Sequence, residues 1–209
     1  MDASQPAGPG PRLRDLGEAA RSAGWILAAV LGLAAGGFVL HFPGSYGELT
    51  GWELGPGVFG FVLGAVNGVA FGLLLWLAAG GGLVAGRRLV LFGALAVGCT
   101  HGLHDASSFL TPYPVVAAAS GALVALAWWL AFRAGPHRRA AIAGVTWAVG
   151  LIAASAAIAA LGLPWEETPV GWATEHAVQG VIVGLVWGGA TVLARPGARS
   201  VALPEAVAG

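Results

Sequence analysis

The chain of 209 residues is strongly apolar: 57% of its residues are hydrophobic, only 10% are charged, and the formal net charge is zero. A soluble domain carries about 25% charged residues, so this composition excludes a soluble globular protein and indicates an integral membrane protein, with the lipid bilayer as its partner. The neutral balance excludes the basic surface of a nucleic-acid-binding protein. The single cysteine, Cys99, excludes a disulfide framework.

Apolar segments long enough to cross a bilayer occur six times along the chain. A hydrocarbon core of about 30 Å needs about 20 apolar residues in a helix. The segments that meet this condition are residues 24–42, 56–80, 88–107, 112–133, 140–162 and 169–194. We therefore expect an all-α, polytopic bundle of six transmembrane helices over residues 24–194. Disordered tails are expected at residues 1–23 and 195–209.

The basic residues predict the orientation of these spans. All ten are arginines, and in a six-span arrangement they all fall on one side of the membrane. They are Arg12, Arg14, Arg21, Arg87, Arg88, Arg133, Arg138, Arg139, Arg195 and Arg199. By the positive-inside rule this side is cytoplasmic. The prediction is a multi-pass protein of the cytoplasmic membrane with both termini inside.

Similar stretches recur within the chain. Residues 65–73 read AVNGVAFGL and residues 177–185 read AVQGVIVGL, which agree at six of nine positions; AASGALVAL at 118–126 is a weaker third copy. We therefore expect tandem helical-hairpin repeats. The repeats place Asn67, Ser120 and Gln179 at equivalent positions. These polar residues are candidate steps of a transport path, and interhelical hydrogen bonds are the alternative explanation.

Glycines recur at every fourth position on the second and sixth spans. They are Gly60, Gly64, Gly68 and Gly72 on the second span, and Gly180, Gly184 and Gly188 on the sixth. Small residues at this spacing let two helix backbones approach closely in a membrane. We expect these stripes to face neighbouring helices.

Titratable side chains cluster near the outer ends of two spans. His101, His104 and Asp105 stand at i, i+3 and i+4 on the third span, and Glu175 and His176 lie on the sixth. At 1.5 Å per residue, His101, Glu175 and His176 lie about 10–12 Å below the outer boundary. Ionisable groups at such depth mark functional sites. We expect the third and sixth spans to pack side by side, with His101 facing His176.

Two kinds of chemistry fit these five residues. Imidazole and carboxylate suit zinc or another divalent transition metal, and His101, His104, Asp105, Glu175 and His176 are the predicted ligands. The same groups suit proton transfer. The functional prediction is a small transport or binding protein with an outward-facing His/carboxylate site for a cation. A membrane-embedded metalloenzyme and a structural or assembly subunit, with partner subunits or as a homo-oligomer, are the alternatives; no catalytic residue is assigned.

Overall fold

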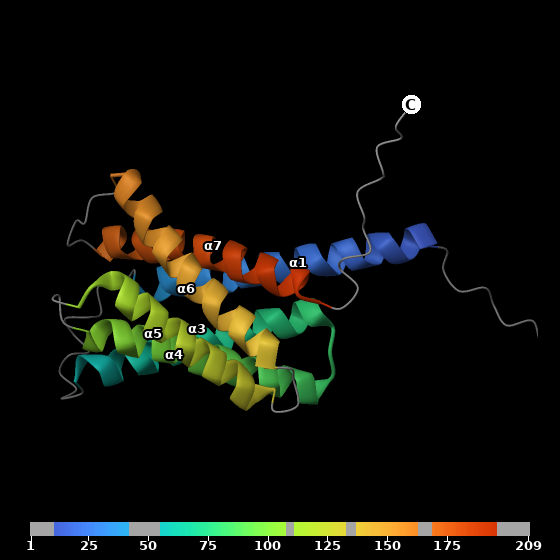
Figure 1. Cartoon of the computed structure of the whole chain (residues 1–209), viewed down its shortest axis with the longest axis horizontal. Helices are drawn as coiled ribbons and strands as arrows, with labels where there is room; N and C mark the ends of the chain where they lie inside the picture. Colours follow the sequence, from blue (N-terminus) through green and yellow to red (C-terminus); the bar gives the residue numbers. More distant parts are fainter. Residues whose placement is uncertain (1–10, 42–54, 108–110, 133–136, 163–168, 196–209) are drawn as a thin grey trace, which may run out of the picture.

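The computed structural model describes residues 11–41, 55–107, 111–132, 137–162 and 169–195. Within these ranges the protein is all-α, and its six helices are each long and apolar enough to cross a membrane (Figure 1). This confirms the predicted class. The helices are α1 (Pro11–His41), α3 (Pro56–Ala79), α4 (Leu83–Ala106), α5 (Tyr113–Ala131), α6 (His137–Ala160) and α7 (Pro169–Leu193).

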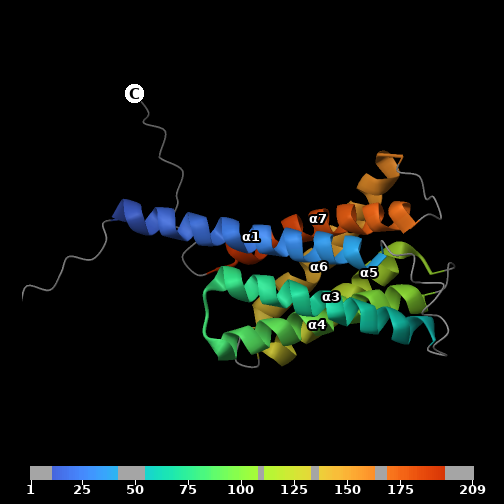
Figure 2. The same ribbon diagram turned by 180° about the vertical axis from the view of Figure 1, so that it is seen from behind.

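Three helices begin earlier than the apolar pattern predicts, among them α6, which begins at His137 and not at residue 140. Helix α1 begins at Pro11, so the second half of the segment expected as a disordered tail, residues 1–23, is helical. Helix α4 begins at Leu83, five residues before the predicted start of that span, and includes Arg87. Apolar length marks where a helix enters lipid, whereas alanine, glutamate and arginine also favour helix in water. The first turns of α1 accordingly run past the neighbouring helices (Figure 2).

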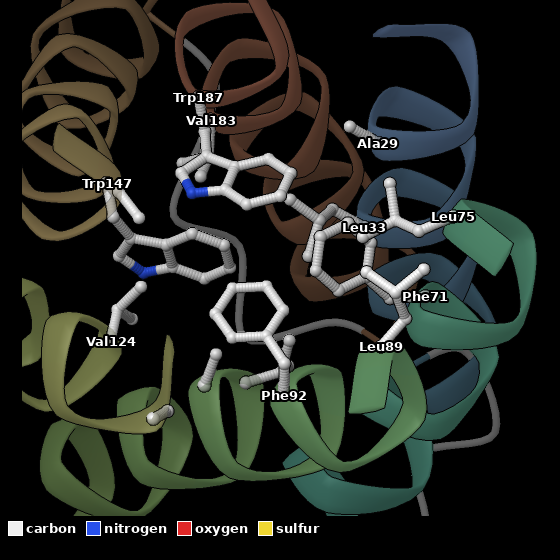
Figure 3. Close-up of a cluster of buried hydrophobic side chains, with 14 of the residues drawn as sticks. Ala29, Leu33, Phe71, Leu75, Leu89, Phe92, Val124, Trp147, Val183 and Trp187 are labelled. Atoms are coloured by element: carbon white, nitrogen blue, oxygen red, sulfur yellow. The ribbon is translucent and has the colours of Figure 1, made fainter. Parts of the chain in front are cut away.

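The six helices form a closed ring in chain order. Helix α1 packs against α3 and α7, and the ring continues from α3 through α4, α5 and α6 back to α7. Figure 3 shows this arrangement along the bundle, with the ribbons surrounding a central group of side chains. Helices α4 and α7 lie on opposite sides of the ring. The prediction that the third and sixth spans pack side by side is therefore wrong, because α1 inserts beside α7 and each other helix pairs with its chain neighbours.

The glycine stripes bring helix backbones into direct contact. A Cβ atom added at Gly68 of α3 would overlap the carbonyl oxygen of Gly93 on α4. One added at Gly184 of α7 would lie 2.7 Å from the Cα atom of Val30 on α1. The same holds at Gly180, where the backbone of α1 lies at 2.5 Å. The expectation that both stripes face neighbouring helices is confirmed.

Alternate helices run in opposite directions, which gathers the described arginines at one end of the bundle. We call it the arginine end, and the opposite one the histidine end; the arginine end holds Arg21, Arg87, Arg88, Arg138, Arg139 and Arg195. The half of the ring nearest the arginine end is filled by aromatic rings. Trp187 lies at their centre, with ring centroids 5.5 Å from Phe71, 5.6 Å from Phe92 and 6.2 Å from Trp147 (Figure 3).

Replacing Gly68 by alanine is expected to destabilise the bundle by about 1–3 kcal/mol, because the added methyl group has to push α3 away from α4. Gly189→Ala on α7 is the matched control, since an added Cβ there meets nothing within 4 Å. The measurement is the thermal unfolding midpoint of each variant in detergent. Equal midpoints for the two variants would contradict the packing.

Candidate functional site

A small cavity lies inside the ring, on the histidine side of the aromatic rings. Its volume is about 40 Å³. Five polar side chains line it, contributed by three helices: Asn67 of α3, Thr100 and His101 of α4, and His176 and Gln179 of α7. Apolar residues of α1 and α6 complete the wall. The bundle therefore contains a partly open pocket that combines polar and apolar side chains.

The two histidines of the cavity meet across the ring. The imidazole rings of His101 and His176 stack with centroids 5.9 Å apart and planes inclined by 23°. Glycines make room for both residues. A Cβ atom at Gly64 would lie 2.8 Å from the Cβ atom of His101, and one at Gly37 would lie 3.0 Å from the carbonyl oxygen of His176. The predicted pairing of these histidines is therefore present, although their helices are not neighbours.

Asn67 and Gln179, two of the three candidate path residues, line the same cavity. Asn67 is only 4% exposed, and its Oδ1 atom has no hydrogen-bond partner among the described residues. The Nε2 atom of Gln179 donates a hydrogen bond of 3.2 Å to the hydroxyl oxygen of Tyr113. Ser120 is 1% exposed and does not line the cavity. A polar path through all three residues thus stays a prediction.

The other titratable residues lie nearer the histidine end and point in different directions. The Nδ1 atom of His104 lies 3.5 Å from Oδ1 of Asp105, and its half-exposed ring approaches Tyr113 of α5 edge-on. Asp105 packs over Gly60 of α3, where an added Cβ would overlap its carboxylate. Glu175 interacts electrostatically with His104.

The described side chains do not assemble the predicted metal shell. A structural zinc ion takes four ligands, and a catalytic one takes three from the protein. Within the described ranges, no three histidine, cysteine or acidic side chains gather closely enough to hold one ion. Three other titratable residues expected near the outer boundary, His41, Glu166 and Glu167, have side chains outside the described part. Four of the five predicted ligands meet as two separate pairs, His101 with His176 and His104 with Asp105. A shared shell stays a prediction.

Tyr113 is the residue of this site that sequence reasoning missed. It is the first residue of α5, and it contacts Gln179 of α7 and His104 of α4. Its sequence signal was a tyrosine between two prolines at the start of a span, which is typical of the membrane interface. The contacts of Tyr113 with two other helices depend on how the helices are arranged in the ring, which the sequence pattern does not give.

Tyr113→Phe and Gln179→Met are expected to be coupled, because each substitution removes the same hydrogen bond between α5 and α7. One such bond contributes about 0.5–1.5 kcal/mol. The unfolding midpoint of the double variant, measured in detergent, should therefore be lowered by less than the sum of the shifts in the two single variants. Strictly additive midpoints would show that the bond does not contribute.

Comparisons of the chain with models of protein families, with curated proteins and with solved structures find no match. The function of the site must therefore be inferred from its own side chains and their geometry.

Proposed function

We propose that the chain is a small membrane transport or binding protein that takes up a cation, either a metal ion or a proton, at the histidine side of the ring. The observation that carries this proposal is the contact of His101 with His176 inside the bundle. Two imidazoles, one buried amide and a glutamine surround a cavity within an apolar protein. Among them, the Oδ1 atom of Asn67 is buried with no hydrogen-bond partner in the described part of the chain. Such an atom is costly, so helix packing alone does not account for the asparagine.

The sequence repeats support the same proposal. In the aligned copies, the positions of Glu175 and His176 are taken by Leu63 and Gly64, and by Val116 and Ala117. Helices α3 and α5 thus pack within the same ring without these ionisable groups. On the repeat that we expect from the sequence, Glu175 and His176 are additions to one copy, which is typical of a site placed on an existing scaffold.

The orientation follows from the two ends of the bundle. Arg195 interacts electrostatically with Arg21 and Arg139, and its pKa is lowered by burial first and by these two arginines second. Arginines concentrated at one end favour a cytoplasmic location for that end. We therefore place the arginine end inside, in the cytoplasmic membrane, and the cavity toward the outside.

A transport function and a binding function differ in what the aromatic half of the ring does. Trp187 is fully buried, and its ring lies between those of Phe92 and Trp25, stacked against both. A transported ion has to pass this point, so the rings have to separate during transport. A binding protein keeps them closed.

The metalloenzyme alternative needs three protein ligands around a metal with an open position. The described residues bring two imidazoles together.

The orientation predicts which positions an impermeant thiol reagent reaches from outside intact cells. In a Cys99→Ala background, Leu161→Cys at the histidine end should be labelled, since this residue is exposed after α6. Gly82→Cys, in the exposed turn between α3 and α4, should be protected until the membrane is permeabilised. Labelling of Gly82→Cys alone would reverse the orientation.

Cation uptake is testable in liposomes that contain a pH-sensitive or a zinc-sensitive dye, together with binding measurements on the solubilised protein. His101→Ala and His176→Ala should each lower uptake or binding by at least about tenfold, because each removes half of the titratable pair. His137→Ala is the matched control, since this exposed histidine lies at the arginine end. Wild-type protein that neither binds nor moves either cation would contradict the proposal.

A further inference from the structure

Three arginines converge at the arginine end, where α1, α6 and α7 pack together. They are Arg21 of α1, Arg139 of α6 and Arg195, which stands two residues after the end of α7. All three residues are exposed. The pKa of Arg195 is lowered by partial burial first, and then by the positive charges of Arg21 and Arg139. Arg195 therefore lies within electrostatic range of one arginine on each neighbouring helix.

The guanidinium group of Arg195 rests on a fixed aromatic ring. Its Cζ atom lies 5.1 Å from the centre of the Trp25 ring. The Nε1 atom of Trp25 donates a hydrogen bond of 2.9 Å to the hydroxyl oxygen of Thr191, and the ring stacks against that of Trp187. A cation–π contact of this kind positions the guanidinium group, while its five N–H donors stay available to an oxygen acceptor.

The described side chains supply no carboxylate to balance these three charges. The salt bridge of the described part joins His104 and Asp105 at the opposite end of the bundle, and no described carboxylate lies within 4 Å of the three guanidinium groups. Glu18, which is exposed on α1, lies about one turn nearer the N-terminus than Arg21. Because converging like charges repel one another, the arginines favour an anion from outside the chain.

Apolar side chains beside the arginines indicate what carries this anion. Leu193, two residues before Arg195, is 72% exposed, and Leu27, two residues after Trp25, is 57% exposed. In a membrane-spanning bundle such leucines face acyl chains. The arginines thus stand where the acyl region of the bilayer meets its headgroups. A phosphate group with attached acyl chains fits both the charges and the leucines, whereas free phosphate fits the charges alone.

We propose that the arginine end binds the phosphate group of an anionic phospholipid between α1, α6 and α7. Arg195 donates to the phosphate from its position on Trp25, and Arg21 and Arg139 donate from the neighbouring helices. Arginine binds phosphate through two parallel hydrogen bonds, and basic pockets between spans on the cytoplasmic side bind anionic headgroups. This surface lies at the opposite end of the bundle from the histidine cavity, so the inference does not depend on the proposed cation site.

The test is a titration of the full-length protein, purified in a neutral detergent, with phosphatidylglycerol, followed by native mass spectrometry. Arg21→Gln, Arg139→Gln and Arg195→Gln should each weaken lipid binding by at least about fivefold, the factor that one arginine contributes to the attraction of an anionic lipid. Each of these residues is exposed, so the variants should fold. Unfolding midpoints measured in detergent without lipid check this.

Arg88→Gln is the matched control. Arg88 is exposed at the same end of the bundle, but it lies on α4, on the opposite side of the ring from α7. The substitution removes the same charge from the same end of the protein. Its affinity for phosphatidylglycerol should match that of the wild type.

Three results would overturn the inference. One is a loss of lipid binding in Arg88→Gln equal to the loss in Arg195→Gln, which would show attraction to the total charge of this end. Another is equally tight binding of phosphatidylcholine, whose headgroup has no net charge. The third is displacement of phosphatidylglycerol by an equal concentration of inorganic phosphate, which would assign the site to free phosphate.

Discussion

Direct contact between helix backbones at glycine is the interaction on which this structure depends. Gly68 of α3 meets Gly93 of α4, Gly121 of α5 meets Gly144 of α6, and Gly180 of α7 meets the backbone of α1. In lipid no hydrophobic force draws helices together, so close van der Waals contact has to do so. These three contacts create three tight helix pairs. The third pair joins the last helix to the first and thereby closes the ring.

Ring closure divides the interior into two unlike halves. Near the arginine end, large rings such as Trp187, Phe71 and Phe92 fill the centre completely. Near the histidine end, glycines beside His101 and His176 leave space, and the imidazoles reach toward one another from opposite sides. A partly open cavity with polar side chains results. The same ring that stabilises the bundle thus determines which titratable groups meet, and it brings the five polar side chains of the cavity together among apolar helices.

Much of the fold could be predicted from the sequence, because the bilayer imposes a length and a periodicity. The six spans, the glycine stripes and the gathering of arginines at one end all follow from local patterns. The start of α1 at Pro11 could not be predicted from hydropathy, since that part of the helix is polar. The site was predictable in depth only. The rise per residue of a helix predicts that His101 and His176 lie at similar depths. The order of the helices around the ring decides which helices lie beside α4 and α7, and which side chains Tyr113 contacts.

The central claim is that His101 and His176 face one another inside the ring. The most direct measurement is magnetisation transfer between the two imidazole rings by NMR in lipid, with each of the five histidines assigned by its own His→Asn substitution. The structure predicts a cross-peak between His101 and His176, whose ring centroids lie 5.9 Å apart, and none between either of them and His137. The absence of a cross-peak between His101 and His176 would contradict the account.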